Sequence, residues 1–131
     1  MKKTIQLAIV LMAMIPSICF AQAKKPVWAE MKAFHYFMST SFHPAEEGNF
    51  KPLKAKADSL FMAAENWQAA AIPTSFKTKE TKAALLQLVK DCLDIKKSVE
   101  ANLSDKELLV MISKAHDTFH TLAGECRKAD D

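Results

Sequence analysis

Four histidines are the residues of this 131-residue chain best suited to chemistry, and they fall in two short stretches. The first stretch holds His35 and His43, each directly after a phenylalanine. The second is the motif His116-x-x-x-His120, whose i, i+4 spacing places both imidazoles on one face of a helix. Imidazole nitrogens are good ligands for Zn, Cu, Ni, Co and Fe. The two stretches therefore predict a transition-metal site, provided that the fold brings them together.

The first 23 residues have the features of a secretory signal peptide, so we expect them to be removed. Lys2 and Lys3 form a basic start, residues 5–15 form an apolar run, and Ala21-Gln22-Ala23 fits the small-x-small cleavage pattern. The apolar run is shorter than the about 20 residues that a membrane-spanning helix needs. We expect a periplasmic or secreted protein that is cut after Ala23, keeps no membrane anchor and consists of residues 24–131.

The composition of the expected mature chain excludes some classes of partner. Removing Lys2 and Lys3 leaves 16 basic residues against 15 acidic ones, a net charge of about +1. The basic residues form no cluster, so we expect no binding to nucleic acid and no general attraction to anionic lipid. The length allows one domain with a modest core.

The two cysteines of the mature chain, Cys92 and Cys126, lie too far apart for a disulfide in the expected fold. They flank the turn of one helical hairpin unequally, which separates them by roughly 20 Å along the helices. A disulfide needs Cα atoms within about 7 Å of each other. Cys92 also occupies an apolar repeat position, so we expect a buried free thiol there.

The mature sequence predicts four helices, because apolar residues recur at three- and four-residue spacing and no useful strand-like alternation occurs. Pro44 and the turn residues Gly48 and Asn49 predict a loop over residues 43–50. Short connections make consecutive helices antiparallel neighbours. The expected fold class is therefore all-α, an up-down-up-down antiparallel four-helix bundle. Its helices are expected over about residues 26–41, 51–71, 79–101 and 104–128, the last starting at the capping box Ser104-Asp105-Lys106-Glu107.

This topology places the first and last helices side by side and antiparallel. Counting inward from residues 26 and 127 at equal rise puts His35 level with about residue 118, midway between His116 and His120. His35 also falls on the apolar seam of the first helix. We therefore expect His35, His116 and His120 to hold one ion between these two helices.

Further ligands for this ion are expected from the segment that follows the first helix. Glu46 and Glu47 can each offer a carboxylate, and water is the alternative. His43 would lie about 12 Å from His35 if both were helical, too far for one ion, so it joins only if a loop folds back. We expect metal binding, sensing or storage rather than catalysis. A structural or chaperone-like helical module without a cofactor is an alternative, because a histidine on a bundle seam is often a core residue.

A small exported four-helix bundle with Met31 in its first helix and His120 near the end of its last resembles the cytochrome b562 and cytochrome c′ group. The resemblance covers the mature chain in length, export and architecture. It implies haem b within the bundle and electron transfer, with Met31 and His120 as the haem ligands. The Cys-x-x-Cys-His motif of covalent haem attachment is absent, and the additional histidines depart from the b-type pattern.

Overall fold

A computed structural model describes residues 28–129, and within them the chain forms four α-helices and no strand. The predictions of an all-α fold and of a four-helix bundle are therefore confirmed. The expected signal peptide and the first residues of the mature chain lie outside the described residues. The helices are α1 (Ala29–Glu46), α2 (Lys51–Ala69), α3 (Thr78–Glu100) and α4 (Asp105–His120), and a π-helical turn (Thr121–Glu125) follows α4.

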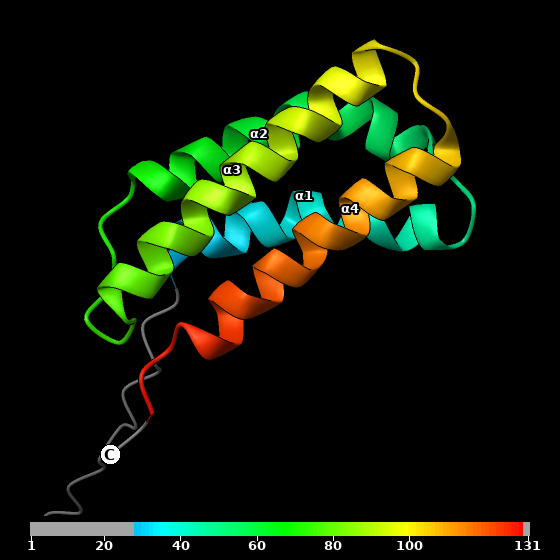
Figure 1. The fold of residues 1–131 in the computed structure, drawn as a ribbon. Helices are drawn as coiled ribbons and strands as arrows, with labels where there is room; N and C mark the ends of the chain where they lie inside the picture. Colours follow the sequence, from blue (N-terminus) through cyan, green and yellow to red (C-terminus); the bar gives the residue numbers. More distant parts are fainter. Residues whose placement is uncertain (1–27, 130–131) are drawn as a thin grey trace, which may run out of the picture.

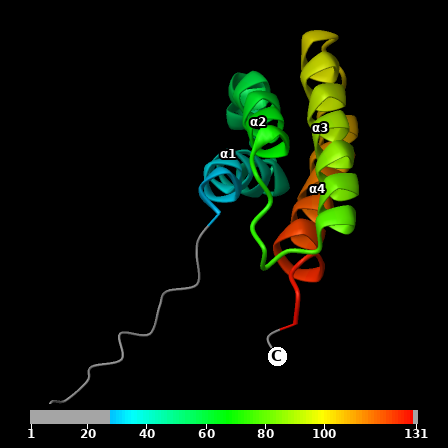
Figure 2. The same cartoon turned by 90° about the vertical axis from the view of Figure 1, so that its left-hand side faces the viewer.

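The helices form two hairpins that cross one another. Figure 1 shows α2 running back along α1, and α4 running back along α3. In Figure 2, α1 and α2 are seen nearly end-on while α3 and α4 are seen from the side, so the two hairpins are not parallel. Of the four contacts between neighbouring helices, the one between α1 and α4 is the least extensive. The histidines of the two stretches lie on these two helices.

Aromatic rings fill the centre of the bundle. Trp67 of α2 is fully buried, and its ring centroid lies 5.5 Å from that of Trp28, 5.5 Å from that of Phe34 and 6.1 Å from that of Phe119. Aromatic pairs at such distances stabilise a fold by about 0.5–1.5 kcal/mol beyond the burial of their area. Trp67 thus joins the start of α1 to the end of α4.

The prediction that the first helix ends near residue 41 is wrong, because α1 continues to Glu46. Pro44 lies in the last turn, where its missing N–H removes a single hydrogen bond. Burial of Ala45, which is 1% exposed, favours the helical continuation. The chain turns only at Gly48, whose φ is 84°, and the amide of Asn49 donates to the carbonyl of Pro44 at 2.8 Å. The loop expected over residues 43–50 therefore begins four residues late.

α4 begins where the capping box predicts and ends before the predicted residue 128. The Ser104 hydroxyl accepts from the Glu107 amide at 3.3 Å, and the Glu107 carboxylate accepts from the Ser104 amide at 3.0 Å. After His120 the helix widens, and the Cys126 amide donates to the Thr121 carbonyl at 3.0 Å. Such π-helical turns are frequent near functional sites.

Both cysteines of the described part of the chain are buried and free, as expected. Cys92 lies on α3 and Cys126 directly after the π-helical turn. Burial raises the pKa of the Cys92 thiol, and the neighbouring Asp91 raises it further. The Cys92 thiol is therefore neutral and unreactive at physiological pH.

One carboxylate is buried between α3 and α4. Asp91 is 4% exposed, and it accepts hydrogen bonds from Lys114 at 2.8 Å, Gln87 at 2.8 Å and Thr118 at 3.2 Å. Its hydrogen bond and negative charge raise the pKa of Lys114. Lys114 and Thr118 flank His116 in the sequence, so Asp91 ties α3 to the segment of α4 that carries the histidine pair.

We predict that Asp91→Ala lowers the free energy of unfolding by about 1–3 kcal/mol, because the donors lose a charged acceptor. Asp94→Ala on the same helix is the matched control. Asp94 is half-exposed and pairs with Lys90 at 3.8 Å, a surface contact that contributes at most about 1 kcal/mol. Urea unfolding followed by circular dichroism measures both variants. Equal losses in the two variants would show that the buried contacts of Asp91 add nothing.

Candidate functional site

The four histidines lie along the seam where α1 meets α4, and we refer to His35, His43, His116 and His120 together as the histidine strip. Two of the rings cover buried phenylalanines. His35 stacks on Phe119 with centroids 5.1 Å apart, and His116 stacks on Phe42 with centroids 3.9 Å apart. The fold therefore brings the two histidine stretches of the sequence together.

His116 and His120 form the tightest pair in the strip. Their Nε2 atoms are 3.2 Å apart, while the ring centroids are 4.4 Å apart, so the two nitrogens face each other. If each nitrogen lay about 2.05 Å from an ion, this separation would correspond to an angle of about 103° at the ion. The same separation also fits a hydrogen bond in which one ring donates to the other. The pair is thus arranged to share either an ion or a proton.

His43 is the histidine of α1 that lies next to this pair. Its ring centroid is 6.2 Å from that of His116, in an edge-on contact. Its Nδ1 lies 3.1 Å from a carboxylate oxygen of Glu46, which accepts a hydrogen bond from Nδ1–H. Such a contact selects the tautomer in which Nε2 is free to bind a metal. Glu46 therefore contacts the candidate ligand His43, rather than the His116–His120 pair.

Glu47 lies beyond Glu46 at the C-terminal end of α1. Its backbone amide donates to the carbonyls of His43 and Pro44 and so closes the helix. Its side chain is exposed. The contacts of Glu47 in the structure are those of a helix cap.

His35 lies at the expected height but not on the expected face. It is level with Phe119, close to the predicted residue 118, yet it is exposed, and Phe34 fills the buried position beside it. Within residues 28–129, no group of three or more His, Cys, Asp or Glu side chains is placed to hold an ion together. The structure thus provides a pair, His116 and His120, with His43 rather than His35 at its side.

The crossing of the two hairpins explains why His43 meets the pair. In a parallel bundle, equal rise would place residue 43 level with about residue 110. Because α1 and α4 cross, Phe42 and His43 in the last turns of α1 instead lie against His116. The i, i+3 spacing of His43 and Glu46 predicts a contact between their side chains only if residues 43–46 are helical, and the sequence predicted a loop there.

The environment of His116 favours its neutral form. Burial lowers the pKa of His116, and the nearby His120 and His43 lower it further, while Asp117 and Glu46 act more weakly in the opposite direction. Neutral imidazole is the form that binds a metal ion. The ring that the Phe42 contact holds in place is therefore ready to act as a ligand at neutral pH.

The bundle interior does not fit a haem held by Met31 and His120. Met31 is partly buried against the core, and His120 is exposed. At this level the interior is filled by Phe34, Trp67 and Phe119, whose centroids lie 5.5–6.1 Å from one another. A porphyrin would have to displace these rings, at a cost of several kcal/mol for each lost buried side chain, on the order of 3–5 for Phe or Trp.

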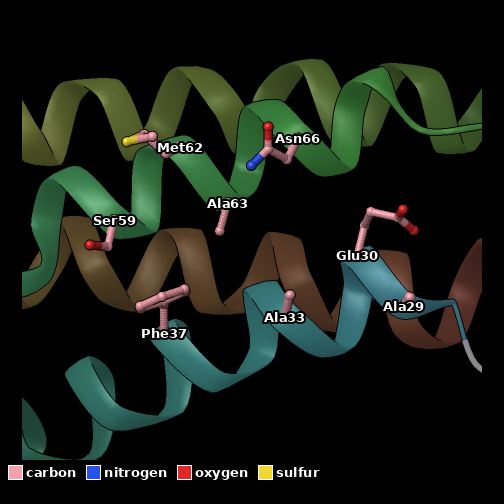
Figure 3. A pocket seen from close by; sticks show the side chains of 8 residues that line it. All are labelled: Ala29, Glu30, Ala33, Phe37, Ser59, Met62, Ala63 and Asn66. Carbon is pink, nitrogen blue, oxygen red and sulfur yellow. The ribbon is translucent and has the colours of Figure 1, made fainter.

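A groove of about 550 Å³ lies between α1 and α2, away from the histidine strip (Figure 3). Ala33 and Phe37 line it, and each stands two residues from His35, which puts them on the opposite side of the helix. Figure 3 shows Glu30 and Asn66 toward one end of the groove and Ser59 toward the other. The full lining is mostly apolar and consists of Ala29, Glu30, Ala33, Phe37, Ser59, Met62, Ala63 and Asn66.

Comparison with known proteins gives no indication of function, so the histidine strip is the main indication. No protein-family model, curated protein or solved structure matches this chain. Among the helices of residues 28–129, none is both long enough and apolar enough to cross a membrane.

We predict that the protein loses stability as the pH falls from about 7.5 to 5. Because the pKa of His116 is lower in the folded protein than in the unfolded chain, the unfolded chain binds a proton first. The contribution of neutral His116 to the free energy of unfolding is complete above the pKa of about 6.5 that histidine has in the unfolded chain. This contribution is lost as the pH falls toward the lower pKa of His116 in the folded protein. His116→Gln should flatten this dependence, and His35→Gln serves as the control for losing one stacked ring. Urea midpoints measured over a pH series test this, and an unchanged slope in His116→Gln would contradict it.

Proposed function

We propose that this protein is an exported, small transition-metal-binding protein that holds its ion through His116 and His120. The proposal includes an up-down-up-down order of antiparallel helices and a signal peptide over residues 1–23 whose removal leaves the domain in the periplasm or outside the cell. The observation that carries it is the 3.2 Å separation of the two Nε2 atoms. Two neutral imidazoles in this arrangement form a chelating pair for an ion such as Zn, Cu, Ni, Co or Fe.

The remaining groups of the strip support binding rather than catalysis. His43 is the nearest additional imidazole of the same chain, and its Nε2 is left to bind a metal when its Nδ1–H donates to Glu46. His120 and His43 are exposed, so water reaches the coordination positions that the pair leaves open. The groove between α1 and α2 lies on the other side of α1, away from these positions. Storage, sensing or transfer of an ion is the use that fits an open, surface site.

A cofactor-free structural module is the second candidate, and one observation favours it. His35 and His116 stack on Phe119 and Phe42, and so cover the least extensive helix contact in the bundle. In that case the rings contribute only packing. Substitution of either ring would then lower stability, and metal ions would leave the unfolding midpoint of the wild-type protein unchanged.

Titration of the purified protein with Zn²⁺, Cu²⁺ and Ni²⁺ by calorimetry tests metal binding. We predict that the double variant His116→Gln/His120→Gln binds at least about 100-fold more weakly than the wild type, because both ligands are lost. His35→Gln is the matched control and should keep wild-type affinity. Bound metal should also raise the free energy of unfolding, by about 2.7 kcal/mol at a free concentration 100 times Kd. Equal affinities in the wild type and the double variant would exclude the site.

The b-type haem alternative, an electron-transfer protein with Met31 and His120 as ligands, is tested by a visible spectrum after addition of haem. We expect no sharp Soret band, because Phe34, Trp67 and Phe119 occupy the interior. A sharp band that disappears in Met31→Leu and in His120→Gln would instead establish a haem protein.

A further inference from the structure

The His116–His120 pair offers two imidazole nitrogens. A tetrahedral Zn²⁺ site takes four ligands, and the pair supplies two. In the described part of the chain, no third His, Cys, Asp or Glu completes a metal-holding group with them. His43 as a third ligand would still leave one of the four positions open.

We propose that a second copy of this chain supplies the other half, so that one Zn²⁺ lies between two chains and is bound by the His116–His120 pair of each. This inference rests on the proposed function, because it uses the same two nitrogens. A twofold axis through the ion makes the two pairs equivalent, which is the commonest symmetry of protein dimers. A separation of 3.2 Å between the two Nε2 atoms is compatible with the tetrahedral coordination that Zn²⁺ prefers.

The surface beside the pair leaves room for a second chain. Gly124, which follows His120 by four residues and lies in the π-helical turn, is exposed. A Cβ added at Gly124 would meet nothing within 4 Å, so the space next to His120 is open. Ala123 beside it is also small. Helices that carry small side chains can approach each other closely, which brings their ligands within reach of one ion.

The pair is also held in a binding conformation before any ion arrives. The ring centroids of Phe42 and His116 are 3.9 Å apart, and the Nε2 atoms of the pair already lie 3.2 Å from each other. A preorganised pair loses little side-chain freedom on binding. The mature net charge of about +1 adds little repulsion between copies. Asp117 and Glu46, the acidic side chains whose charges act on His116, offset part of the charge of the ion.

Zn²⁺ titration with calorimetry and sedimentation velocity, on protein purified after expression of the full sequence, tests the shared site. We expect about half an equivalent of Zn²⁺ per chain and conversion of monomer to dimer, both reversed by EDTA. His35→Gln, the matched control on α1, should dimerise like the wild type. His116→Gln/His120→Gln should stay monomeric at all Zn²⁺ concentrations. Circular dichroism establishes that each variant is folded, and the single change His120→Gln, at an exposed position, should weaken dimerisation at least about tenfold.

The outcomes separate the shared site from the proposed function. One equivalent of Zn²⁺ bound per chain by a protein that stays monomeric would overturn the shared site and leave metal binding standing. A dimer that forms without Zn²⁺, or that the double variant retains, would also overturn it. A wild-type protein that binds no Zn²⁺, Cu²⁺ or Ni²⁺ would remove both the shared site and the proposed function.

Discussion

The contact between α1 and α4 is the constraint on which the candidate site depends. It is the least extensive helix contact in the bundle, and it is built from Phe34, Phe42 and Phe119 with histidine rings stacked over them. The aromatic rings anchor this seam to Trp67 in the centre. Because the hairpins cross, the two helices meet over a short length, and every histidine of the described chain lies within that length.

This packing gives the histidines two roles that need not compete. His116 covers Phe42 with one face of its ring, while its Nε2 atom points along the surface toward His120. Burial lowers the pKa of His116 and so favours the neutral ring. The neutral ring can both pack against Phe42 and bind a metal ion. The carboxylate of Asp91 on α3 stabilises the same turn of α4, because it accepts hydrogen bonds from Lys114 and Thr118 on either side of His116.

Local rules predicted much of the fold from the sequence. Apolar periodicity located α2 and α3 to within about two residues at each end, and the capping box located the start of α4 at Ser104. The rule that proline ends a helix was wrong at Pro44, because burial of Phe42 and Ala45 outweighs one lost hydrogen bond. The end of α4 was also misplaced, because apolar periodicity does not distinguish a π-helical turn from an α-helix.

For the candidate site, the sequence alone was sufficient for the His116–His120 pair, because i, i+4 spacing within one helix depends only on helix geometry. It was also sufficient to place His35 near residue 118, because His35 stacks on Phe119 in the structure. Which histidine of α1 lies beside the pair was decided by tertiary structure. His43 takes that place, and His35 turns outward over Phe119, because the crossing of the hairpins and the continuation of α1 past Pro44 both arise from packing between distant residues.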